Sequence, residues 1–193
     1  LPGTLSPEDV NDAYPHVFHK QGREYLVFAS DREGGFGSLD LWYTTRPLSG
    51  SVQDFDLPRN LGGLINTQGS ELTPFYDTEA QCLYFSSNGH VNIGGLDIFA
   101  TQGDFTYWEN PINMGMPYNS PCHDLSYVQN ATGRGGVLVS NRKYGFERTQ
   151  TLDFDIFEFQ TPLNPYMIYG YTIHAVEEVI LANTLGYLYE LDE

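Results

Sequence analysis

Cysteine and positive charge are both scarce in this sequence, and each shortage excludes a class of protein. Cys82 and Cys122 are the only cysteines, too few for a fold that several disulfides hold together in place of a core. The pair either forms one bridge between neighbouring structural units or remains as two buried thiols, and we favour the thiols. Lysine and arginine number 9 against 25 acidic residues, which gives a formal net charge of −16. Such a surface repels phosphate backbones and anionic lipid headgroups, so we expect no nucleic-acid partner.

Long apolar runs and helix-forming runs are missing as well. No apolar stretch approaches the roughly 20 residues of a membrane-spanning helix, so we expect no direct insertion into a membrane. Runs rich in alanine, leucine, glutamate and lysine, which are typical of helix bundles, do not occur. Residues 1–10 contain two prolines, a glycine and a serine and are expected to form a linker.

Aromatic residues and turn-forming residues are abundant instead. The chain has 14 Tyr and 12 Phe, and it has 20 Gly and 11 Pro. This combination is typical of an all-β protein with many turns. Because hydrophobic residues make up 40% and charged residues only 18% of the sequence, the composition is not that of a disordered chain.

The sequence contains three diverged copies of one repeat of about 55 residues. The most regular element ends in Ser30, Ser87 and Ser140 or just after them, and these serines are 57 and 53 residues apart. An Asn-x-Gly element occurs twice, at Asn60 and Asn113, again 53 residues apart. The other aligned segments are 12–17, 71–75 and 124–128 upstream, and 39–42, 96–99 and 154–157, of the Asp-Ile-Phe type, downstream.

Each copy is predicted to form four short antiparallel strands. Glycines cluster between the second and third strands, where a hairpin loop needs positive φ angles. A four-stranded sheet that recurs at this interval is typical of a β-propeller blade, which buries its faces against its neighbours. We therefore predict an all-β fold of three blades (about 11–66, 67–119 and 120–162), either a partial propeller or part of a larger ring, followed by a short C-terminal β segment in 163–193.

These segments resemble the WD40-like repeat of the TolB-type β-propeller group. The resemblance covers about residues 11–162 and rests on Leu-Tyr-Phe-Ser-Ser-Asn at 83–88 and Gly-Gly-Leu-Asp-Ile-Phe at 94–99. The second copy departs from the pattern, with Gly89 and His90 in place of the arginine of the other copies. The third copy has an insertion (143–152) before its Asp-Ile-Phe.

The versions of the repeat found here are most similar to those of Bacteroidota envelope proteins. In such proteins a propeller lies beside a carboxypeptidase-regulatory-like β domain and an OmpA-type peptidoglycan-binding domain, and some members belong to the type IX secretion apparatus. The resemblance therefore implies a periplasmic or outer-membrane-associated protein that is part of a larger polypeptide or complex. It also leaves two alternatives for 163–193, the last propeller strand or the start of the carboxypeptidase-regulatory-like domain.

The recurring acids Asp40, Asp97 and Asp155 are predicted to be structural. A catalytic group is seldom supplied once per blade, whereas an aspartate at the start of a strand accepts hydrogen bonds from loop amides. We expect Arg32 to lie near Asp40, and Arg142 near Asp155, each fixing its own hairpin.

A second set of acids recurs at the start of the first strand of each copy. Asp12, Glu71 and Asp124 either ring a central channel, where they could meet a cation or a basic peptide, or cap the turns between blades. We favour capping, because buried turn amides must find acceptors.

Signatures of catalysis and metal binding are lacking. Nothing singles out a pair of carboxylates for glycoside cleavage, Gly-x-Ser-x-Gly is absent, and the five histidines have no metal-site spacing. We expect no catalytic residue, no metal and no cofactor.

The loops between the second and third strands carry apolar residues at comparable places. Exposed together, they would make a recognition patch, or else they pack against the next blade. Trp42 aligns with Phe99 and Phe157 and is expected in the core, whereas Trp108 has no counterpart in the other copies. The candidate interaction residues are Phe36, Val91, Ile93, Tyr144, Phe146 and Trp108.

Two functions follow from these features. The preferred one is a non-catalytic interaction module that presents one face to a protein partner in the envelope. The alternative is a carbohydrate-binding or glycoside-cleaving propeller, because aromatic side chains such as Trp108 stack on sugar rings and carboxylates bind hydroxyl groups.

Overall fold

The computed structural model describes residues 7–142, 154–160, 172–173 and 180–181. Within these ranges the chain is all-β, with a single turn of 3-10 helix, Val52–Asp54, and no α-helix. Residues up to Thr161 form one compact unit, and Pro162–Glu193 form a second. The predicted all-β fold class is confirmed.

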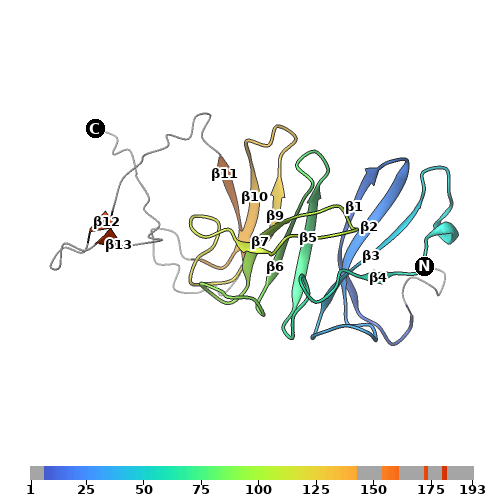
Figure 1. The fold of residues 1–193 in the computed structure, drawn as a ribbon, viewed down its shortest axis with the longest axis horizontal. Helices are drawn as coiled ribbons and strands as arrows, with labels where there is room; N and C mark the ends of the chain where they lie inside the picture. The colour runs from blue at the N-terminus through green and yellow to red at the C-terminus, as the bar shows by residue number, and fades with distance from the viewer. Residues whose placement is uncertain (1–6, 143–153, 161–171, 174–179, 182–193) are drawn as a thin grey trace. The chain divides into compact units, whose positions relative to one another are not determined.

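Three antiparallel sheets follow one another in the first unit (Figure 1). The first two have four strands each in chain order, and the third has the order β11-β10-β9. The strands are β1 (Asp12–Lys20), β2 (Arg23–Ser30), β3 (Asp40–Pro47), β4 (Arg59–Asn60), β5 (Glu71–Asp77), β6 (Cys82–Ser87), β7 (Asp97–Gln102), β8 (Ile112–Asn113), β9 (Asp124–Gln129), β10 (Gly135–Ser140) and β11 (Asp155–Gln160).

The second unit contains a short β pair, as the sequence predicted for the C-terminal segment. Its strands β12 (Thr172–Ile173) and β13 (Ile180–Leu181) are antiparallel, with Thr172 opposite Leu181 and Ile173 opposite Ile180.

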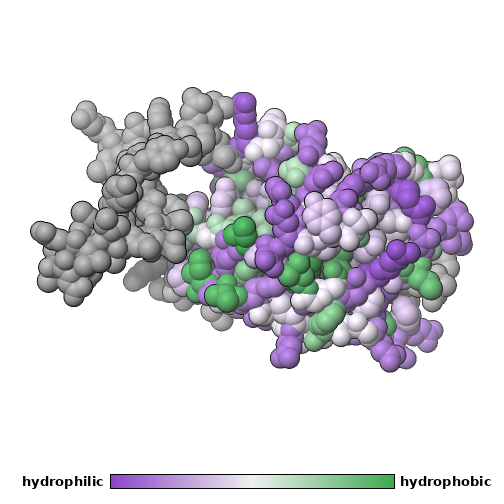
Figure 2. Space-filling view, in the orientation of Figure 1, coloured by the Kyte–Doolittle hydropathy of each residue, from purple (hydrophilic) through white to green (hydrophobic). Residues whose placement is uncertain are grey.

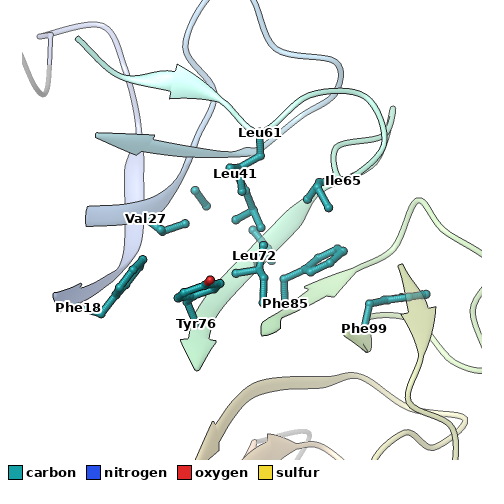
Figure 3. Packing of buried hydrophobic residues seen from close by; sticks show 11 residues of the cluster. Phe18, Val27, Leu41, Leu61, Ile65, Leu72, Tyr76, Phe85 and Phe99 are labelled. Carbon is teal, nitrogen blue, oxygen red and sulfur yellow. The ribbon is translucent and has the colours of Figure 1, made fainter. Parts of the chain in front are cut away.

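The sheets bury their faces against one another. Leu72 and Tyr76 of β5 pack into one cluster with Phe18, Val27 and Leu41 of the first sheet (Figure 3). A second cluster joins Ile98 of β7 to Tyr127 and Leu138 of the third sheet. Burial on both faces explains why β2 ends in four consecutive buried residues, since a sheet with one wet face would alternate.

The first strand of each sheet contains a β-bulge that the sequence did not predict. Tyr14, Thr73 and Ser126 occupy aligned positions and have positive φ angles of 53°, 49° and 56°. The pairing register shifts at each of these places. The bulges also link neighbouring sheets, because the Ser126 amide donates to Thr73 Oγ1 at 3.0 Å. A residue in this conformation is strained, and its recurrence at three aligned positions indicates that the bulge is a conserved feature of the repeat's first strand within this chain.

Candidate protein-binding surface

The loops between second and third strands are held by the buried aspartates that open β3 and β7. Asp40 accepts hydrogen bonds from the backbone amide of Phe36 (2.6 Å) and of the residue after it (3.0 Å). Asp97 does the same for Ile93 (2.5 Å) and its successor (3.1 Å). Both carboxylates are buried. The structure therefore gives these two acids the structural role predicted from their recurrence, and each fixes the backbone that carries an apolar loop residue.

An asparagine on the fourth strand completes each aspartate site. Asn60 Nδ2 donates to Asp40 Oδ2 at 2.8 Å, and Asn113 Nδ2 donates to Asp97 Oδ2 at 2.7 Å. Each buried carboxylate thus accepts three hydrogen bonds, which replace the bonds to water that it loses on burial. Sequence analysis aligned these asparagines with each other but assigned them no partner.

A second asparagine ties the following turn back to the third strand. Asn66 Oδ1 accepts from the Leu41 amide (2.8 Å), and its Nδ2 donates to the Leu41 carbonyl (3.0 Å). Asn119 repeats both bonds with Ile98, at 2.7 and 2.8 Å. Both asparagines are buried. In both copies this asparagine follows the first residue of the Asn-x-Gly element by six positions, and sequence reasoning noted that recurrence only as part of a motif.

The arginine of the first sheet has a different partner from the one predicted. Arg32 Nη2 forms an ion pair with Asp12 Oδ1 at 2.8 Å, on the first strand, and its Nε donates to Ser30 Oγ at 2.9 Å. This pair corrects the expectation that Arg32 would fix Asp40, whose carboxylate is occupied by loop amides and Asn60. The alignment showed that both residues recur but not which strand lies beside the arginine.

The arginine of the third sheet repeats this arrangement. Arg142 Nη2 pairs with Asp124 Oδ1 at 2.6 Å, again on the first strand, and Arg142 also donates to the carbonyls of Pro117 (2.6 Å) and Tyr118. The structure thus ties Arg142 to Asp124 and not, as predicted, to Asp155, which is exposed. Asp124 is fully buried.

The acids of the first strands cap the connections between sheets, which confirms the favoured alternative for Glu71 and Asp124. Glu71 Oε2 accepts from the Thr67 amide at 2.9 Å, and Asp124 Oδ2 accepts from the Ser120 amide at 2.6 Å. In the second sheet, where no arginine is present, Ser87 Oγ donates to Glu71 Oε1 at 2.7 Å instead. These carboxylates are committed to backbone and hydroxyl donors.

Apolar side chains are exposed on the held loops and on the connections beside them. Of the predicted interaction residues, Phe36 is 53% exposed, Val91 91% and Ile93 48%. Leu64 and Met116, which sequence analysis did not single out, are also exposed and lie on the connections that follow β4 and β8. We call these five residues the apolar rim. Tyr144 and Phe146 lie outside the described residues.

The rim residues of the first sheet (Phe36 and Leu64) and those of the second (Val91, Ile93 and Met116) are carried by neighbouring segments at one end of the sheets. His90, on the loop that carries Val91, lies with its Nε2 2.9 Å from the Ile65 carbonyl, next to Leu64. A Cβ on Gly63 would lie 2.8 Å from the Phe36 ring, so Phe36 packs over that glycine. Figure 2 shows that hydrophobic residues on the visible face form several separate patches among polar ones.

Close approach of the backbone explains two glycines of these loops. A Cβ on Gly37 would lie 2.3 Å from the carbonyl oxygens of Thr67 and Gly69, and a Cβ on Gly94 would lie 2.1 Å from that of Cys122. The loop of one sheet therefore lies directly on the connection leading into the next, and any larger residue would push them apart.

Trp108, predicted as a candidate interaction residue, is partly buried and packs against other rings. Its ring lies edge-on to Phe105 (centroids 5.0 Å apart) and to Tyr76 (6.3 Å), at the margin of the main core cluster. Trp42 is buried as predicted.

Burial shifts the pKa of several titratable groups near the sheet interfaces. Desolvation raises the pKa of the Cys82 thiol and of the Tyr84 and Tyr127 hydroxyls, and it raises the pKa of Tyr76 to about 12. Both cysteines are free thiols, Cys82 buried and Cys122 partly so, in agreement with the favoured alternative.

Metal-ligand groups and membrane-spanning helices were sought in the described part of the chain. No group of three or more histidine, cysteine, aspartate or glutamate side chains is placed to hold a metal ion there. In the same residues no helix has the length and apolar character needed to cross a bilayer.

The comparisons with known proteins add no family to this geometry. No protein-family model and no curated protein matches the chain.

Proposed function

We propose that this chain is a non-catalytic interaction module of a bacterial cell-envelope protein and that it binds a protein partner through the apolar rim. The observation that carries the proposal is the exposure of Phe36, Val91 and Ile93 on loops whose backbone is held by buried aspartates. A rigid loop loses little conformational entropy when its apolar side chain is buried by a partner. Exposed apolar residues on such loops are therefore suited to anchor a protein–protein contact.

The proposed envelope location, and the proposal that these sheets are blades of a propeller, rest on the resemblance of the repeat to TolB-type proteins. The recurring acids also favour binding over catalysis, because Asp40, Asp97, Glu71 and Asp124 are each occupied by structural hydrogen bonds. Trp108, which the carbohydrate alternative named as a residue that could stack on a sugar, packs edge-on against Phe105 and Tyr76, and this favours the protein-binding proposal at the rim.

The test is a pull-down from a Bacteroidota envelope extract with the tagged chain and a rim variant, Phe36→Ser combined with Ile93→Ser. We expect the wild-type chain to recover a protein that the variant does not. Leu48→Ser is the matched control, because Leu48 is similarly exposed but follows β3, at the β1–β2 turn end of its sheet. Equal recovery by the rim variant and the wild type, or measured turnover of a substrate by the purified chain, would contradict the proposal.

A further inference from the structure

A groove opens between the first sheet and the loop that joins β7 to β8. Its cavity volume is about 390 Å³, within the range of roughly 300–1,000 Å³ that small-molecule sites occupy. It is separate from the apolar rim in residues: the lining consists of Arg23, Tyr25, Tyr43, Thr44, Thr45, Asp56, Leu57, Arg59, Asp104, Phe105 and Thr106.

Aromatic rings form one part of the lining. Tyr25 and Tyr43, on neighbouring strands, are nearly parallel, with an interplanar angle of 13°. Phe105 lies 5.2 and 5.0 Å from these two rings and has a positive φ angle of 75°. An L-residue is rarely found in this conformation unless its surroundings impose it. The loop therefore holds the Phe105 ring in place against the first sheet.

Polar groups with fixed orientations form the rest of the lining. Arg23 donates to Thr45 Oγ1 at 2.8 Å and pairs with Asp56 at 2.5 Å. On the opposite wall Asp104 Oδ1 accepts from the Thr106 amide at 3.0 Å. Hydrogen bonds of this kind leave further lone pairs and N–H groups for a ligand.

Arg59 is the most available of these groups. It lies on β4 opposite Tyr43 and is exposed. Among the residues that the structure describes, no ion-pair partner is present for its side chain. An unpaired guanidinium offers five donors in a fixed plane.

We propose that this groove binds a neutral carbohydrate. Its two guanidinium groups are matched by two carboxylates, Asp56 and Asp104, so the site has no excess charge with which to attract an ion. An acidic ligand would also meet the field of a chain with net charge −16. A purely apolar ligand would desolvate four charged groups without satisfying them. A sugar ring satisfies both parts of the lining, because its hydroxyl groups donate and accept while its C–H face packs on aromatic rings.

The test is a ¹H–¹⁵N NMR titration of the whole chain with chitotriose, cellotriose and maltotriose in separate experiments. We expect at least one trisaccharide to shift the amide signals of Arg59, Asp104 and Thr106 in a saturable way. Arg59→Ala and Asp104→Asn are each expected to weaken that binding about tenfold. Arg134→Ala is the matched control, because Arg134 is exposed on the β9–β10 turn, outside the groove, and it should leave the affinity unchanged.

Glucuronic acid is titrated in the same way as an acidic comparison. Three results would overturn the proposal: no shifts with any of the three neutral sugars, shifts that map outside the groove, or tighter binding of glucuronic acid than of the neutral sugars. Circular dichroism of each variant separates lost binding from lost folding. Asp104→Asn keeps a side-chain oxygen for Thr106, so we expect this variant to fold. The rim variant (Phe36→Ser combined with Ile93→Ser) should retain sugar binding, which keeps this outcome independent of the protein-binding proposal.

Discussion

The first two sheets and the third share the same Asp-x-aromatic element, yet its middle residue has opposite environments in them. Leu41 and Ile98 are fully buried, whereas the aligned Ile156 on β11 is 75% exposed. In the first two sheets an asparagine from the turn after the fourth strand bonds to the backbone of this residue. Leu41 and Ile98 each pack in a cluster with residues of the following sheet, so burial at this position comes from the neighbouring sheet and is not a property of the element itself.

The largest expected difference between these regions is in the cost of truncating the shared residue. Ile98→Ala removes side-chain atoms from the cluster with Tyr127 and Leu138 and should lower the free energy of unfolding by about 2–5 kcal/mol. Ile156→Ala, at an exposed site, should change it by less than about 0.5 kcal/mol. Urea denaturation followed by circular dichroism measures both. A loss of several kcal/mol for Ile156→Ala would show that this residue is covered in solution, and it would remove the contrast.

A smaller effect is expected from the asparagine that closes the second sheet. Asn119→Ala leaves the buried amide and carbonyl of Ile98 without the bonds that Asn119 supplies. We expect a loss of about 2–3 kcal/mol, since an unsatisfied buried polar group costs about 1–3 kcal/mol. Asn66→Ala should cost a similar amount in the first sheet, where the same two bonds are made to Leu41. If either variant unfolds at the wild-type urea concentration, the asparagine is not what joins the turn to its sheet.

Much of the fold could be predicted from the sequence because the repeat reports on strands and turns directly. The serine element and the Asp-x-aromatic element correspond to β2, β6 and β10 and to β3, β7 and β11. Phe36 and Ile93 could be assigned to loops because each lies between the serine element and the aspartate of its copy. The sequence left open whether they are exposed or packed against the next blade, and the structure has them exposed.

The failures concern information that an alignment of repeats does not contain. Arg32 and Asp40 recur together, but recurrence does not tell which strand lies next to the arginine side chain, and Asp12 is the partner found. Trp108 lies in a loop without a counterpart, so its packing on Phe105 depends on how that loop crosses to the first sheet. The bulges at Tyr14 and Thr73 were missed because neither residue type favours a positive φ angle.

The smallest expected effect is a pH dependence of stability that arises from one buried tyrosine at each of the two interfaces between the sheets. Tyr76 lies in the core that joins the first and second sheets and donates to the Gly103 carbonyl at 2.9 Å. Desolvation raises its pKa from 10.0 to about 12. Because the folded state holds this proton more tightly than the unfolded state, its contribution to stability is complete below pH 10 and is lost as the pH rises from 10 towards 12. Urea midpoints measured between pH 9 and 12 should therefore fall.

Tyr127 at the second interface allows the same measurement, since burial raises its pKa as well. Tyr76→Phe and Tyr127→Phe should each make the decline of the urea midpoint in alkali shallower, whereas Tyr107→Phe, an exposed tyrosine, should leave it as in the wild type. A decline unaffected by Tyr127→Phe but reduced by Tyr76→Phe would mean that water reaches the interface between the second and third sheets. The third sheet would then differ from the other two on its inner face as well as at Ile156, and the contrast between the regions would extend through the whole sheet.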